Sequence, residues 1–206
     1  MSSTFIQNYM DLPDNFYSQI STEPLNNAKL IHFNQSLAQE LGIDLSEADI
    51  LAMTAGQKFA DGLTPIAQKY TGHQFGYYNP NLGDGRGALL GQVKMQNSYN
   101  SAEKLWDIHL KGCGQTPYSR RGDGRAVLRS AVREYMIGEA LHGLGIPTTR
   151  CLSLCTNGEW VQREQLEPRA SYIRVAKTHV RFGHFEWLAQ QNDRTGLMLM
   201  AEYVID

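Results

Sequence analysis

Apolar side chains recur at two different spacings along this chain, and the spacings predict where its helices and strands lie. Residues 33–42 and 44–55 carry apolar positions three to four apart, and a glycine closes each run. Asp44 and Glu47 have the spacing of a helix N-cap and its capping-box partner. The pattern over residues 1–65 therefore predicts an N-terminal extension made of helices and loops.

The pattern changes after residue 65. Residues 70–87 are crowded with glycine, asparagine, proline and aromatic residues, a composition typical of loops. Residues 88–93 and 106–110 predict two strands joined by a polar connection over 94–104. Residues 123–142 give the strongest helix prediction, with Asp123 as its N-cap.

Shorter apolar runs predict the remaining elements. Residues 151–155 and 159–162 flank Asn157-Gly158, a sequence typical of a tight β-hairpin turn. A further strand is expected over 171–176, and helices over 185–191 and 197–204. The order is loop, two strands, helix and three strands, which predicts an α+β fold: an antiparallel sheet with one helix packed on it.

Composition and charge narrow the class of protein. The 206 residues are 42% hydrophobic and 19% charged, with a formal net charge of −2. This composition excludes a disordered chain and gives no basic surplus that would attract nucleic acid or an anionic membrane. The opening residues lack a basic start and an apolar run, and no stretch approaches about 18 apolar residues. We therefore expect a soluble, cytoplasmic protein.

The cysteines and histidines give no metal signature. Three cysteines form a poor disulfide framework and suit a reducing compartment. Cys151 and Cys155 are spaced like a zinc pair, but two further ligands at fitting spacing are absent from the sequence, so we expect small buried residues. The spacing of the histidines matches no standard metal site, and we expect hydrogen-bonded structural roles for them: His73, His109, His179 and His184.

A glycine-rich run, Gly83-Asp-Gly-Arg-Gly87, precedes the strand predicted over 88–93. Closely spaced glycines let backbone N–H groups approach phosphate oxygens, and Arg86 adds a permanent cation. The run lacks the Lys-Ser/Thr pair of the Walker motif and the spacing of the dinucleotide fingerprint. Taken alone, it is more typical of an ordinary turn.

Lys111 ends the strand predicted over 106–110, where a kinase-like fold places the lysine that pairs with nucleotide phosphates. Glu134 lies on the next predicted helix, where such a fold places the glutamate that holds this lysine. Glu139 competes for that role on the same helix. Taken alone, Lys111 is more typical of a solvated strand end, and for either glutamate the alternative is a solvated helix face.

Arginines mark two further segments. Residues 112–125 form a long polar, glycine-rich stretch that contains three arginines and leads into a predicted helix N-terminus, a feature that favours anions. Arg174 lies inside an apolar strand, so it needs a carboxylate or a phosphate partner. A buried ion pair and a phosphate site remain equally open from the pattern.

Several long strings occur together in a fixed order. They are Tyr70-Thr-Gly-His-Gln-Phe-Gly76, the run from Asn81 to Gly87, the run from Trp106 to Arg125, Gly145-Ile-Pro-Thr-Thr-Arg150 and His179-Val-Arg-Phe-Gly-His-Phe-Glu186. In these strings the chain, from about Leu30 onward, resembles the selenoprotein O family. Members of that family have pseudokinase sequences and transfer AMP from ATP to Ser, Thr or Tyr hydroxyls of proteins.

The resemblance implies a fold and a site. It implies a protein-kinase-like N-lobe over residues 66–206, preceded by the helical extension over 1–65 and followed in the family by a second lobe. It implies ATP bound in a flipped pose, Lys111 held by Glu134, and Mg²⁺ or Mn²⁺ bound by the second lobe. The positions that match nucleotide contacts of the family are Gly83, Gly85, Arg86, Lys111, Asp123, Gly124, Arg174 and Arg181.

The chain also departs from the family. Family chains are more than twice this length, and no catalytic aspartate or metal-binding string occurs before Asp206. We therefore expect an N-terminal fragment that binds nucleotide weakly, has no catalytic residue and no metal ligand of its own, and self-associates through an exposed apolar face. A phosphoryl-transferring kinase and a non-catalytic ATP-binding module remain alternatives. Dinucleotide-dependent reduction is disfavoured because the glycines precede antiparallel strands.

Overall fold

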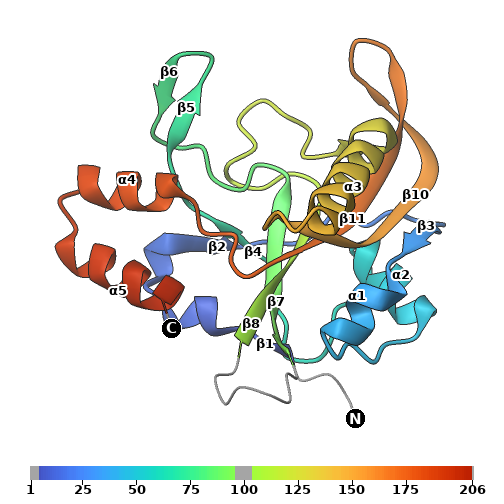
Figure 1. The fold of residues 1–206 in the computed structure, drawn as a ribbon. Coiled ribbons are helices and arrows are strands. Elements are labelled where there is room, and N and C mark those ends of the chain that lie inside the picture. Colours follow the sequence, from blue (N-terminus) through green and yellow to red (C-terminus); the bar gives the residue numbers. More distant parts are fainter. Residues whose placement is uncertain (1–4, 96–103, 206) are drawn as a thin grey trace.

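The computed structural model describes residues 5–95 and 104–205, which form an α+β fold around one large antiparallel sheet (Figure 1). Within these residues the sheet has nine strands, with the order β2-β4-β7-β8-β11-β10-β3 along its main path. Two short strands lie off this path, β1 beside β7 and β9 beside β11. The predicted α+β class with an antiparallel sheet is confirmed.

The N-terminal third contributes both helices and strands. Its elements are β1 (Phe5–Ile6), the 3₁₀ helices η1 (Asn8–Asp11) and η2 (Asp14–Phe16), β2 (Tyr17–Gln19), β3 (Lys29–Phe33), α1 (Gln35–Glu40) and α2 (Glu47–Thr54). The expectation of helices and loops alone was therefore incomplete, because β1, β2 and β3 pair with β7, β4 and β10 of the sheet. These strands are too short to show a period of two in the sequence.

The remaining elements follow from residue 66. They are β4 (Ile66–Gln68), β5 (Gly72–Gln74), β6 (Tyr77–Asn79), β7 (Gly87–Met95), β8 (Lys104–Lys111), β9 (Ala126–Val127), α3 (Leu128–Gly143), β10 (Arg150–Gln162), β11 (Leu166–Ala176), α4 (Phe182–Gln190) and α5 (Arg194–Ile205). The predicted loop over 70–87 contains the small β5–β6 hairpin, which stands apart from the main sheet (Figure 1). Most of the polar connection predicted over 94–104 lies outside the described residues.

Three predicted local signals were wrong. The side chain that caps α2 is Ser46, not Asp44, because it accepts the Asp49 N–H at 3.1 Å. Helix α3 begins at Leu128, five residues after the expected cap Asp123. Asn157-Gly158 does not end a strand; a register shift between Thr156 and Trp160 accommodates it as an irregularity within β10.

The alternation of side chains across the sheet separates a hydrophobic face from the face that carries the site. Ile108 and Leu110 of β8 and Ile173 of β11 pack with α1 and α2 in the largest apolar cluster. The intervening residues of the same strands point to the opposite face, where α3 packs against β10 and β11 (Figure 1). Helices α4 and α5 pack with η1 and η2 in a separate cluster that includes Tyr9 and Trp187.

No helix of the described residues is long and apolar enough to cross a membrane. The three cysteines are free and buried, and burial raises the pKa of Cys113 to about 12. Within residues 5–95 and 104–205, no group of three or more His, Cys, Asp or Glu side chains is placed to hold a metal ion.

Candidate nucleotide site

A polar cleft of about 1160 Å³ is the main candidate site. Its walls come from the β5–β6 region, the glycine-rich run over 83–87, strands β8 and β11, the loop over 112–125 and the start of α4. The cleft brings together all eight residues expected to contact nucleotide: Gly83, Gly85, Arg86, Lys111, Asp123, Gly124, Arg174 and Arg181.

Strand register places the central side chains of the cleft. Lys111 lies opposite Gly87 on one neighbouring strand and opposite Tyr172 on the other. Arg174 lies opposite His109 in the same pairing of β8 with β11. Because alternate residues share a face of the sheet, these side chains point away from the apolar cluster under α1 and α2 and into the cleft side.

Lys111 forms the ion pair with Glu134 that the sequence led us to expect, with Nζ 2.6 Å from Oε1. Burial and the nearby Arg174 guanidinium lower the pKa of Lys111 to about 8, against the opposing effect of Glu134. Burial alone would raise the pKa of Glu134, but its hydrogen bond with Lys111 lowers it. The competitor Glu139 instead binds Arg150 and Asn34 and does not reach the cleft.

The glycine-rich run over 83–87 lies directly against residues 116–119 of the following loop. The Thr116 hydroxyl donates to the Asp84 carbonyl at 2.7 Å, and the Ser119 hydroxyl donates to the Gly85 carbonyl at 2.6 Å. A Cβ atom at Gly83 would lie 2.2 Å from the Tyr118 ring. The run therefore needs glycine for close packing as well as for an open approach to a ligand.

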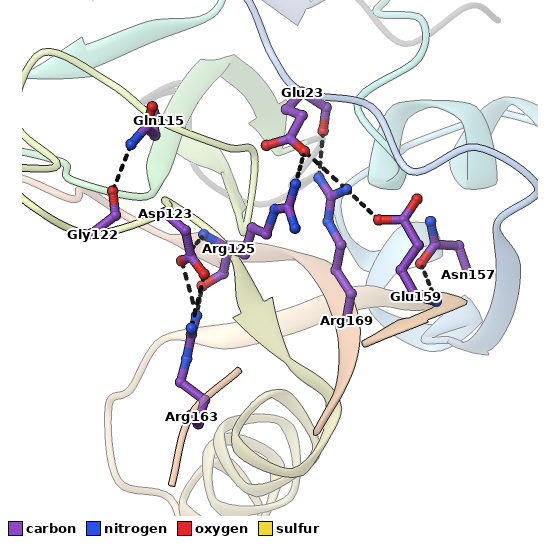
Figure 2. A network of polar contacts seen from close by, with 9 residues as sticks. All are labelled: Glu23, Gln115, Gly122, Asp123, Arg125, Asn157, Glu159, Arg163 and Arg169. Atoms are coloured by element: carbon purple, nitrogen blue, oxygen red, sulfur yellow. Dashed lines mark hydrogen bonds and ion pairs between the residues drawn. The ribbon is translucent and has the colours of Figure 1, made fainter. Parts of the chain in front are cut away.

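A network of ion pairs fixes the loop over 112–125 (Figure 2). Arg163 donates two hydrogen bonds to the Asp123 carboxylate, at 2.8 and 2.9 Å. Arg125 pairs with Glu23 of the N-terminal segment at 2.6 Å. Buried Arg169 of β11 binds both Glu23 and Glu159, so one cluster ties the loop to the N-terminal segment and to strands β10 and β11. Asp123 thus acts as an anchor of the loop and is not a helix cap.

Gly124 closes this loop and gives a first testable prediction. Its φ is +68°, and an added Cβ would lie 1.9 Å from the Gly114 carbonyl oxygen. We expect Gly124→Ala to lower the free energy of unfolding by several kcal/mol, since it adds a backbone clash to the cost of a left-handed residue, about 1–2 kcal/mol. Urea unfolding measures this difference.

Gly62→Ala is the matched control for Gly124→Ala. Gly62 has a φ of +83°, but no atom lies within 4 Å of the added Cβ. This variant should lose only the left-handed cost, about 1–2 kcal/mol. Equal losses in the two variants would show that the contact between Gly124 and Gly114 does not constrain the loop.

The cleft is rich in arginine side chains. Within the described residues, no ion pair with a carboxylate forms at five of the arginines that line it: Arg86, Arg120, Arg121, Arg174 and Arg181. The sequence left open whether Arg174 pairs with a carboxylate or with a phosphate. Within the described residues its contact is a histidine, with Nη2 3.3 Å from Nδ1 of His109. The Arg181 guanidinium lies 5.3 Å from the centre of the Tyr70 ring.

Several residues that line the cleft were not assigned to it from the sequence. Arg120 and Arg121 were noted only as members of a cationic loop, and that clustering was their signal. Asp84 lies inside the glycine run, and His109 lies two residues before Lys111. Their closeness in sequence to assigned residues is the signal that could have identified both. Arg163 had no sequence signal, because it comes from the turn after β10.

Comparison with known proteins decides the family. The family model described as "Protein adenylyltransferase SelO" matches residues 1–206, the whole chain.

This chain belongs to the SelO family.

Curated relatives of this SelO-family chain include bacterial proteins that carry the name "Protein nucleotidyltransferase YdiU". The relative from Hydrogenovibrio crunogenus is 57% identical over 186 residues, which cover 88% of this chain and 38% of the relative. The relative from Chromohalobacter salexigens is 48% identical over 203 residues, covering 95% of this chain and 40% of the relative. The relative from Klebsiella pneumoniae is 46% identical, covering 100% of this chain and 42% of the relative. The SelO-family chain thus spans about two fifths of the length of these relatives.

Proposed function

We propose that this chain is the nucleotide-binding part of a protein adenylyltransferase that transfers AMP from ATP to Ser, Thr or Tyr hydroxyls of proteins. The observation that carries the proposal is the cleft, in which Lys111 of the Lys111–Glu134 pair lies with five arginines that pair with no carboxylate of the described residues. Such a surplus of fixed positive charge suits a polyphosphate. Membership of the SelO family and the name of the relatives support the same activity.

We infer further that residues 66–206 form a protein-kinase-like N-lobe. The glycine-rich run, the two strands β7 and β8, the lysine at the end of β8 and the glutamate on α3 follow the order of such a lobe. The three N-terminal strands, β1, β2 and β3, add to this sheet by pairing with β7, β4 and β10.

The charges suit AMP transfer in a definite way. A protein hydroxyl oxygen bonds to the α-phosphorus and gives up its proton to solvent, the bond from that phosphorus to the bridging oxygen breaks, and pyrophosphate leaves with the electron pair. Negative charge then develops on the β and γ phosphates, and cations fixed around them stabilise the transition state. Lys111, Arg174 and Arg181 are the cations that we assign to these phosphates.

A divalent metal ion that accompanies the phosphates, Mg²⁺ or Mn²⁺, neutralises charge on the leaving group when it is bound. Within the described part of the chain, two of the three acidic residues that line the cleft offer it little, because hydrogen bonds occupy both oxygens of Asp84 and Arg163 binds Asp123. We propose that the metal ligands lie in the part of the relatives that this chain does not span.

Two labelled nucleotides test the proposed reaction in the whole protein. With ATP labelled at the α-phosphate, label should appear on protein substrates; with ATP labelled at the γ-phosphate, it should not. The reverse result would establish a phosphoryl-transferring kinase, the second candidate, which the Lys111–Glu134 pair also suits. For this chain alone we expect ATP binding by calorimetry and no label transfer from either nucleotide.

The lowered pKa of Lys111 predicts how ATP binding depends on pH. Lys111 titrates near pH 8, and only its protonated form attracts phosphate. ATP affinity should therefore be greatest below pH 8 and should fall as the pH rises from 7 to 9.5. Isothermal titration calorimetry across this range measures the change.

Lys111→Arg is the control for this pH dependence. Arginine remains charged over the whole range. Its affinity, whatever the absolute value, should stay constant between pH 7 and 9.5. A parallel decline in Lys111→Arg would assign the titration to another group.

A further inference from the structure

Two buried side chains, Asp84 and His109, connect the glycine-rich run to Arg174. His109 is 2% exposed and lies between Asp84 and Arg174. Its Nε2 atom is 3.3 Å from Oδ2 of Asp84, and its Nδ1 atom is 3.3 Å from Nη2 of Arg174. The three groups therefore form a continuous chain from the glycine run to a cation of the cleft.

The chemistry of these groups allows one arrangement of protons. A guanidinium only donates hydrogen bonds, so Nδ1 of His109 must accept from Arg174. The single proton of the neutral imidazole then lies on Nε2 and is donated to the Asp84 carboxylate. Burial lowers the pKa of His109, which agrees with a neutral ring.

Asp84 is itself held firmly. The backbone N–H of Gln68 donates to Oδ2 at 3.1 Å, and the Tyr70 hydroxyl donates to Oδ1 at 3.2 Å. Burial alone would raise its pKa, but the hydrogen bonds that it accepts from His109 and from the Gln68 N–H keep the pKa below its usual range. A charged carboxylate thus fixes one side of the imidazole ring.

The glycine run also makes room for the ring. A Cβ atom at Gly87 would lie 2.3 Å from Cε1 of His109, so only glycine lets the imidazole lie at this position. The ring also stacks on His179, with centroids 4.6 Å apart. Hydrogen bonds hold both nitrogen atoms of the His109 ring.

We propose that Asp84 and His109 are positioning residues that orient the Arg174 guanidinium toward the nucleotide phosphates. Asp84 sets the tautomer of His109, and His109 occupies one N–H of Arg174. The other N–H groups of Arg174 then remain for the ligand, and its Nε has no hydrogen-bond partner in the described residues. This inference rests on the proposed nucleotide site and assigns a role to two residues that do not themselves contact the phosphates.

The tautomer of His109 tests the orientation directly and needs no nucleotide. Long-range ¹H–¹⁵N NMR of the chain at pH 7 should show the proton on Nε2, with Nδ1 unprotonated. Arg174→Ala should shift the Nδ1 resonance of His109. A proton on Nδ1 would overturn the inference, because that atom then accepts nothing from Arg174.

Matched variants test the effect on binding. His109→Gln introduces an amide N–H that can donate to Asp84 in place of Nε2 but removes the Nδ1 acceptor that faces Arg174, so ATP affinity should fall about tenfold by calorimetry. His179→Gln makes the same change in the stacked histidine, which is also buried but does not line the cleft, and should leave the affinity within twofold. Urea unfolding of both variants gives the stability against which the affinities are compared.

The outcomes separate the two proposals. A similar loss of ATP affinity in His109→Gln and His179→Gln, or no loss in either, would overturn the positioning role. Failure of the wild-type chain to bind ATP would instead contradict the proposed nucleotide site. In that case the NMR result still decides whether Asp84 and His109 fix the arrangement of Arg174.

Discussion

Lys111→Ala is expected to weaken ATP binding by at least about 30-fold, because it removes a half-buried cation of the cleft and leaves Glu134 without its partner. The Lys111 side chain is only 15% exposed, so little solvent screens its charge from a phosphate. The unpaired Glu134 carboxylate would also repel the nucleotide. Isothermal titration calorimetry at pH 7 measures the loss.

Two further variants show where this effect comes from. Lys29→Ala makes the same substitution at an exposed position on β3 outside the cleft, and the affinity should not change. Lys111→Ala combined with Glu134→Gln removes both charges and should recover part of the loss. An affinity of Lys111→Ala within twofold of wild type would contradict a phosphate site at Lys111.

Arg169→Ala is expected to lower the free energy of unfolding by about 3 kcal/mol, the largest stability effect that we predict outside the glycines. The Arg169 side chain is 2% exposed and donates to Glu159 at 2.8 Å and to the Glu23 carbonyl at 3.0 Å (Figure 2). Removing it leaves a void and a carbonyl without its donor. Because the two carboxylates are partly exposed, water limits the electrostatic part of the loss.

Arg133→Ala is the control for this measurement. Arg133 is exposed on α3 and has no ion pair within the described residues, so its removal should change stability by less than about 0.5 kcal/mol. Urea unfolding compares both variants with wild type. If Arg169→Ala is as stable as Arg133→Ala, the network of Figure 2 does not hold the loop over 112–125.

The sequence predicted those parts of the fold that depend on local patterns. Strands β7 and β8 and helices α1, α2, α4 and α5 were all expected within a few residues of their bounds, because apolar spacing and glycines act locally. Asn157-Gly158 misled because β10 continues through it, held by pairing with β11 on one side and β3 on the other. The N-terminal strands were missed because their partners are distant in the chain.

The same division applies to the site. Lys111 and Glu134 were paired from their order along the chain, which reflects local structure, and the resemblance to a family added the glycines. The partners of Asp123 and Arg174 were not, because Arg163 and His109 reach them only after the sheet has formed. A long-range ion pair leaves no period in a sequence, so only the coordinates connect these residues.

The order of strands in the sheet has a consequence during synthesis of the chain. Its two edges, β2 and β3, come from residues 17–33, whereas the partner of β3 is β10, more than a hundred residues further on. A ribosome releases the N-terminus first, so these edge strands emerge early and stay unpaired until the middle of the chain has followed. The largest apolar cluster joins α1 and α2 to strands as late as β11, so the core closes only when residues near 175 are free of the exit tunnel. Such non-local pairing makes folding slow, and the early segments stay exposed, as surfaces that chaperones bind, until their partners have been synthesised.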